Sequence, residues 1–122
     1  MLTGSRTKQI GRWGETQACH FLLRSGFSVV ERNYQVPAGE IDIIARTPEG
    51  DYYFIEVKTH QAGALGNDTA ITPFKKLKMQ KTLRRYCYER QVGAAESLVT
   101  AGLLVIVNRA KSSVKFRLAV YC

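Results

Sequence analysis

The stretch from Gly39 to Thr59 constrains the fold of this chain more than any other segment. Two apolar runs, Ile41–Ala45 and Tyr52–Val57, flank a turn signal at Pro48–Asp51, and this pattern predicts a β-hairpin. Side chains in a strand alternate between two faces, so the charged residues that interrupt these runs gather on one side of the hairpin.

Charged side chains on this hairpin predict a divalent-metal site. In simple antiparallel register Asp42, Glu56 and Lys58 converge, with Glu40 close by. Charges within apolar strands cost free energy unless they are paired or bound to an ion. The expected ligands are the carboxylates of Asp42 and Glu56 and the backbone carbonyl of Val57. The expected metal is Mg²⁺, which prefers oxygen ligands, with Mn²⁺ as a substitute.

Such a site predicts metal-assisted hydrolysis of phosphodiester bonds. A divalent ion polarises the scissile phosphate and lowers the pKa of an attacking water. Lys58 would orient that water or offset the charge that grows on the phosphoryl oxygens.

Apolar residues at helical spacing predict a helix from about Ile10 to Ser25, capped by Gly26, after a mobile basic tail over residues 1–9. Glu15 lies on or beside the apolar face of this helix. Two interpretations stay open. Glu15 is either a carboxylate aimed into the metal site or a first-turn residue favoured by the helix dipole.

A second helix is expected from Pro73 to about Gln91, and it is strongly basic. Its predicted core stripe is Phe74, Leu77, Leu83, Tyr86 and Cys87. Because phosphate neutralisation dominates affinity for nucleic acids, the cations predict a binding surface made of Lys75, Lys78, Lys81, Arg84 and Arg85. The alternative is an ordinary solvated helix face. His60, next to the Lys58 strand, and Gln80, on the helix, are possible accessory residues.

The remaining segments complete one α/β domain over residues 1–122. A first strand is expected at Phe27–Gln35 and a flexible, glycine-rich loop at 61–72. An apolar run at Gly102–Val107 predicts a strand covered on both faces, and Val114–Tyr121 predicts an edge strand.

Charge and cysteine content narrow the partners and the compartment. The net charge of +8 favours a polyanion partner, nucleic acid first, although solubility alone would also explain it. Three widely spaced cysteines support neither a disulfide framework nor a zinc site, and they suit reduced thiols in the cytoplasm. No apolar run approaches the roughly 20 residues of a membrane span, and no secretory signal is visible, so no membrane partner is expected.

Four motifs occur in order along the chain: Gly-x-x-Gly-Glu (Gly11–Glu15), Gly-Glu-Ile-Asp-Ile-Ile-Ala (Gly39–Ala45), Phe-Ile-Glu-Val-Lys-Thr (Phe54–Thr59) and Thr-Pro-x-Lys (Thr72–Lys75). This set resembles the YraN-like family of bacterial proteins over about 11–86. That family is regarded as a distant relative of archaeal Holliday junction resolvases within the PD-(D/E)XK nuclease superfamily.

The resemblance implies a restriction-endonuclease-like αβββαβ core with a mixed central sheet flanked by helices, and Mg²⁺-dependent cleavage that leaves 5′-phosphate ends. By motif match, Asp42 takes the place of the metal-binding Asp, and Glu56 and Lys58 that of the Glu-x-Lys pair. Glu15 matches the helix-borne acid of the resolvase branch. His60 departs from the family pattern, since relatives often have Arg there.

The sequence therefore predicts a metal-dependent endonuclease that acts on structured or branched DNA, with DNA expected over RNA and a homodimer expected by analogy with resolvases. The alternative is a nucleic-acid-binding module on a nuclease-like fold, inactive alone or dependent on a partner. The intact set of Asp42, Glu56 and Lys58 favours the enzyme. A basic protein without a nucleic-acid role is the least favoured hypothesis.

Overall fold

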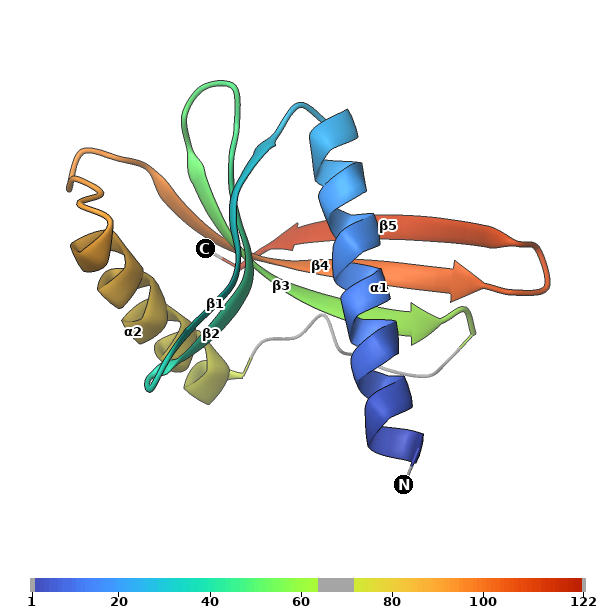
Figure 1. Cartoon of the computed structure of the whole chain (residues 1–122). Helices are drawn as coiled ribbons and strands as arrows, with labels where there is room; N and C mark the ends of the chain where they lie inside the picture. Colours follow the sequence, from blue (N-terminus) through green and yellow to red (C-terminus); the bar gives the residue numbers. More distant parts are fainter. Residues whose placement is uncertain (1, 64–71, 122) are drawn as a thin grey trace.

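The computed structural model describes residues 2–63 and 72–121, with side chains described from residue 8 onward. The elements run α1 (Leu2–Arg24), β1 (Ser28–Val36), β2 (Gly39–Arg46), β3 (Tyr52–Gln61), α2 (Pro73–Glu89), β4 (Leu98–Asn108) and β5 (Ser113–Val120) (Figure 1). This order confirms the predicted α/β fold with its restriction-endonuclease-like core. None of the described helices is long and apolar enough to cross a membrane.

The five strands form one mixed sheet in the order β1-β2-β3-β4-β5. Strands β1, β2 and β3 pair antiparallel as a meander, and β4 pairs antiparallel with β5. Strands β3 and β4 are parallel, so α2 serves as the crossover that parallel neighbours require.

Each face of the sheet carries one helix. On one face Ala18, Cys19 and Leu22 of α1 pack on a cluster that includes Ile55. On the other face Leu83 and Tyr86 of α2 pack on a second cluster that includes Phe54. Because Phe54 and Ile55 are consecutive in β3, they point to opposite faces, and both helices bury their apolar sides against the same strand. The helices lie well apart in Figure 1.

The ends of both helices follow local sequence signals, with one exception. Gly26 adopts a φ of 95°, and the Phe27 N–H donates to the Leu22 carbonyl at 2.9 Å, which is the predicted glycine cap. Thr72 caps α2 by accepting from the Lys75 N–H at 3.2 Å. The exception is the start of α1, which lies at Leu2 rather than near Ile10.

Residues 2–9 belong to α1, so a helix occupies the segment for which a mobile tail was predicted. Of the predicted loop over 61–72, Gln61 is the last residue of β3 and Thr72 is the cap of α2, while 64–71 lie outside the described residues.

The predicted core stripe of α2 needs correction. Leu83 and Tyr86 are buried as expected, but Phe74 and Leu77 are exposed by 70% and 53%. Met79 and Thr82 complete the buried stripe instead. Burial of Thr82 is tolerated because its hydroxyl donates to the Lys78 carbonyl at 2.8 Å, which satisfies its polar group within the helix.

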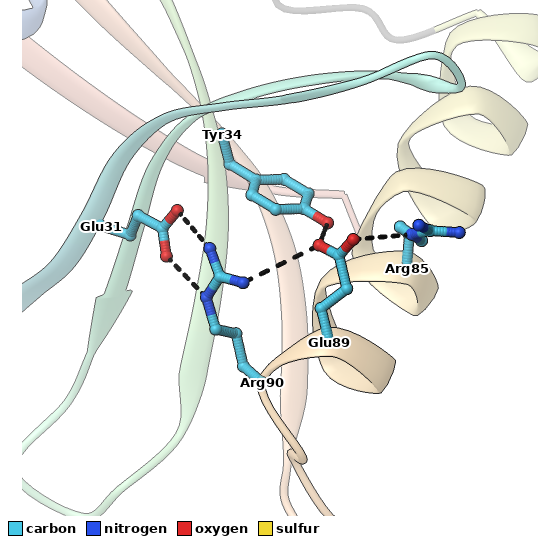
Figure 2. A network of polar contacts seen from close by, with 5 residues as sticks. All are labelled: Glu31, Tyr34, Arg85, Glu89 and Arg90. Atoms are coloured by element: carbon cyan, nitrogen blue, oxygen red, sulfur yellow. Dashed lines mark hydrogen bonds and ion pairs between the residues drawn. The ribbon is translucent and has the colours of Figure 1, made fainter.

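A polar network fastens the C-terminal end of α2 to β1 (Figure 2). The buried Tyr34 hydroxyl donates to Glu89 Oε1 at 2.5 Å, and Arg85 Nε donates to Glu89 Oε2 at 2.8 Å. Arg90 forms two hydrogen bonds to Glu31, at 3.2 and 2.9 Å. Burial and the bond to Glu89 raise the pKa of Tyr34 to about 12.

Replacing Tyr34 by Phe is expected to lower the free energy of unfolding by about 1–2 kcal/mol, because the hydrogen bond from the buried Tyr34 hydroxyl to Glu89 is lost. Since the folded pKa of about 12 lies above the ordinary 10, this contribution is complete below pH 10 and is lost as the pH rises through 12. Urea unfolding at pH 7 measures it. Tyr88→Phe is the control, because Tyr88 is 82% exposed and should change stability by less than about 0.5 kcal/mol.

Candidate functional site

The paired residues of β2 and β3 end where the predicted acids begin. The strands pair from Arg46–Tyr52 to Ile43–Ile55. One position further, the Asp42 carboxylate accepts a hydrogen bond from the Val57 N–H, with 2.8 Å between Oδ2 and N. A side chain thus takes the place of the next backbone contact. In a strand the N–H and C=O of one residue leave on the same side, so the Val57 carbonyl also faces β2.

Three further carboxylates lie within electrostatic reach of Asp42. Burial raises the pKa of Asp42 to about 6, although the Val57 N–H opposes the shift. The negative charges of Glu15, Glu40 and Glu56 raise it further. Ionisation of Asp42 is therefore unfavourable in the metal-free protein, and a bound cation would stabilise the ionised carboxylate.

Glu15 belongs to the same group although it comes from α1. Burial raises the pKa of Glu15, and the charge of Glu40 adds to this effect, while Arg32 and Arg12 oppose it. The interpretation of Glu15 as a first-turn residue was wrong, because α1 begins at Leu2 and Glu15 lies in the interior of the helix. Its charge acts on Asp42.

Gly14 sets the position of Glu15 by letting α1 approach β3. A Cβ atom at Gly14 would overlap the Thr59 hydroxyl, so only glycine allows this approach without a shift. Gly11, one helical turn earlier, has no neighbouring atom within 4 Å of such a Cβ.

A groove of about 630 Å³ lies between the β1–β2 hairpin, β3 and the start of α2. Its sheet wall carries Glu40 and Glu56, and its helix wall carries Lys75 and Lys78 beside Phe74. Gln35 Nε2 donates to Glu40 Oε2 at 3.1 Å, which holds one of the acids in place. This carboxylate groove thus places negative charge opposite positive charge.

Lys58 lies on the same strand as Glu56 but lines a different, small pocket with Arg117 and Tyr121 from the end of the chain. The sequence placed Lys58 together with Asp42 and Glu56. Of these three residues only Glu56 lines the groove between the hairpin and α2, and neither Asp42 nor Lys58 is among its lining residues.

Tyr121 is a neighbour of the site that sequence reasoning missed. Its hydroxyl lies over Gly102, where any Cβ would overlap it, and Gly102 pairs with Glu56 across β3 and β4. Burial raises the pKa of Tyr121, and the charge of Glu56 adds to the shift. The available signal was Gly102 itself, since glycine inside an apolar strand often marks the close approach of another group.

The predicted basic surface is divided by the structure. Lys75 and Lys78 line the groove, Lys81 is exposed, and Arg85 binds Glu89. Arg84 lines another groove of about 250 Å³ together with Gln80. His60 lines a third groove, of about 510 Å³, beside Trp13 of α1. Gln80 and His60 are therefore not among the residues that line the carboxylate groove.

The donor set fits a hard divalent cation. Among the described residues, no three His, Cys, Asp or Glu side chains are grouped closely enough to hold a metal by themselves. Asp42, Glu56 and the Val57 carbonyl would supply two carboxylates and one neutral oxygen. Mg²⁺ suits such a partial set because it keeps several of its waters.

The mixed sheet, the crossover helix and the order of the elements define an α/β protein with a restriction-endonuclease-like core. The chain belongs to the family described as "Uncharacterised protein family UPF0102", whose pattern matches residues 14–107.

Several bacterial relatives carry the name "UPF0102 protein". One from Roseiflexus castenholzii is 50% identical over 49% of this chain and 47% of its own length. One from Alkaliphilus oremlandii is 41% identical over 64% of this chain and 63% of its own length. One from Clostridium botulinum is 40% identical over 70% of this chain and 69% of its own length. The chain thus matches about half to two thirds of these relatives.

Among solved structures, Pyrococcus furiosus SfsA in complex with Ca²⁺ is similar over 97% of this chain and 63% of that one, with 16% identity and a TM-score of 0.31.

Proposed function

We propose that this protein is a metal-dependent endonuclease that hydrolyses phosphodiester bonds of structured or branched DNA. The observation that carries the proposal is Asp42, a half-buried carboxylate where β2 and β3 part, which accepts from the Val57 N–H and feels the charges of three further acids. Such a charge is costly for stability alone, and a strongly perturbed acid is a mark of a functional site.

The chain's own groups divide the work. Asp42, Glu56 and the Val57 carbonyl would hold the cation, with Glu15 and Glu40 adding negative potential around it. A bound Mg²⁺ would supply Lewis-acid chemistry, which lowers the pKa of water and offsets charge on the phosphate. Lys75 and Lys78 hold backbone phosphates from the opposite wall. Lys58 would offset charge on the phosphoryl oxygens if substrate extends from the groove over β3.

The second candidate function is a binding module that does not cut alone. One observation favours it: Lys58 lies with Tyr121 and Arg117 rather than in the groove that Glu56 lines. A partner or a bound substrate would then be needed to bring the lysine to the phosphate.

Cleavage of linear, single-stranded, flapped and four-way-junction DNA separates the two functions. The assay uses purified protein with Mg²⁺, with Mn²⁺ and with EDTA. We expect cutting with either metal, none with EDTA, and a preference for branched substrates. Salt-sensitive binding without cutting under all conditions would establish the binding module instead. The absence of both binding and cutting would contradict both candidate functions.

Replacing Lys75 and Lys78 together by Ala is expected to weaken DNA binding and to flatten its salt dependence. Each lost phosphate contact should reduce the slope of log K against log salt by about 0.9 on duplex DNA. Fluorescence anisotropy between 50 and 200 mM salt measures this slope, and about two phosphate contacts are expected to be lost. The control replaces Lys111 and Lys115 by Ala. Both lysines are exposed near the β4–β5 turn, and their replacement removes the same amount of charge. An equal loss in both variants would point to net charge rather than to the groove.

A homodimer is a further part of the proposal, because a four-way junction is two-fold symmetric and suits a two-fold enzyme. Sedimentation velocity with and without junction DNA tests it, and a single protomer bound per junction would contradict it.

A further inference from the structure

Phe74 exposes a large aromatic ring at the edge of the carboxylate groove. It lies in the first turn of α2, lines the groove, and is 70% exposed. The helix does not need this ring for packing, because Met79, Leu83 and Tyr86 form its buried side. Covering a ring of this size is favourable because it removes apolar surface from water, and the position of Phe74 at the groove favours a ligand that covers the ring.

The surroundings of Phe74 indicate the chemistry of that ligand. Lys75 and Lys78 line the same groove, and the Lys78 Nζ lies 5.9 Å from the centre of the Phe74 ring. An aromatic face next to cations is the combination with which proteins bind single strands, since bases stack on the ring and phosphates meet the lysines. A purely apolar ligand would leave the lysines without a partner.

The size of the groove also favours an unpaired nucleotide over a duplex. Its volume of about 630 Å³ lies within the range of small-ligand sites. Paired bases inside a duplex cannot present their faces to a side chain, whereas unpaired bases can.

We propose that Phe74 stacks on the base of an unpaired nucleotide while Lys75 and Lys78 bind the phosphates on either side. The nucleic acid bound here therefore carries unpaired bases beside the carboxylates, as a flap or a frayed branch point does. That this strand is also cut rests on the proposed nuclease function, whereas the stacking itself does not.

Binding measurements test the stacking without requiring cleavage. The protein carries Asp42→Asn, which removes a proposed metal ligand, and the probes are a labelled single strand, a duplex and a flapped duplex. We expect Phe74→Ala to weaken binding of the single strand and the flap by about tenfold to a hundredfold. Duplex binding should change by less than about twofold. Phe74→Trp should bind as tightly as the parent or more tightly.

Two neighbouring residues provide matched controls. Tyr88→Ala removes an exposed aromatic ring from the other end of α2, and Leu77→Ala removes an exposed apolar side chain that does not line the groove. Both should leave all three affinities unchanged. A 2-aminopurine base in the single strand adds a direct readout, because stacking on Phe74 should quench its fluorescence and Phe74→Ala should restore it.

The outcomes separate this inference from the proposed function. Equal losses on single strand and duplex, equal effects of Phe74→Ala and Tyr88→Ala, or no loss at all would overturn the stacking. If wild-type protein cuts DNA while Phe74→Ala binds and cuts normally, the nuclease stands and the inference fails. If Phe74-dependent binding is found but wild-type protein never cuts, the inference stands and the nuclease fails.

Discussion

Replacing Asp42 by Asn is expected to abolish metal-dependent cleavage and, at the same time, to stabilise the metal-free protein. Asn keeps the shape of the side chain and an oxygen that can accept from the Val57 N–H. It removes the charge that burial and the acids Glu15, Glu40 and Glu56 make costly. Cleavage should fall by at least about 100-fold, the scale seen when one group that stabilises developing charge is lost.

The stabilisation should depend on pH in a defined direction. The folded pKa of Asp42, about 6, lies above its ordinary 3.8, so the folded protein holds the proton more tightly than the unfolded chain does. The contribution of Asp42 to stability is thus fully present below about pH 4 and is lost as the pH rises through 6. Relative to wild type, Asp42→Asn should gain up to about 3 kcal/mol at pH 7.5 and almost nothing at pH 4.

Urea unfolding in EDTA at the two pH values measures this gain, and the cleavage assay measures the loss. Glu49→Gln is the matched control, because it makes the same carboxylate-to-amide change at an exposed turn position. Added Mg²⁺ should raise the midpoint of wild type and Glu49→Gln but not of Asp42→Asn. A variant that still cuts normally would remove the mechanism, and an unchanged stability would show that Asp42 is not a strained charge.

Replacing Gly14 by Ala is expected to destabilise the protein by about 1–3 kcal/mol, because the added Cβ overlaps the Thr59 hydroxyl where α1 meets β3. A loss of stability would be informative, because Gly→Ala within a helix normally raises stability. Gly11→Ala is the control in the same helix. Its Cβ meets nothing within 4 Å, so it should stabilise by up to about 1 kcal/mol.

A compensating change identifies the cause. Thr59→Ala removes the hydroxyl, and the double variant with Gly14→Ala should recover most of the lost stability in a double-mutant cycle. Because Glu15 follows Gly14 directly, Gly14→Ala should also reduce cleavage, and the double variant should restore it. Destabilisation that persists in the double variant would place the strain elsewhere in α1.

Local signals were sufficient to predict most of the fold. The hairpin of β2 and β3, the cap at Gly26 and the start of α2 at Pro73 depend on neighbours in sequence, and the structure confirms each of them. The simple alternation expected for Ile41 and Ile43 was wrong, because Ile41 packs in the cluster under α2 and Ile43 in the cluster under α1. Glu15 was ambiguous because the helix dipole explains a first-turn acid equally well, and only the packing of α1 on β3 brings it to Asp42.

Features that depend on three-dimensional placement could not be read from the sequence. Phe74 matched the apolar spacing of α2, but which apolar positions are buried depends on where the helix crosses the sheet. Lys58 and Tyr121 are far apart in sequence, and their shared pocket follows from the pairing of β4 with β3 and β5. The alternation of faces predicts the side of a strand, not which neighbour occupies it.

The single parallel pairing of β3 with β4 has a consequence for the order of folding. The β1–β2–β3 meander joins neighbours in sequence through short turns, whereas β4 reaches β3 only after α2 has formed a long crossover. Loop closure over such a distance slows the non-local step. The meander, with Asp42 and Glu56 already close together, is therefore expected to assemble early. The mutual repulsion of these acids then acts on the nucleus itself, so a divalent cation should speed folding and change the unfolding rate little.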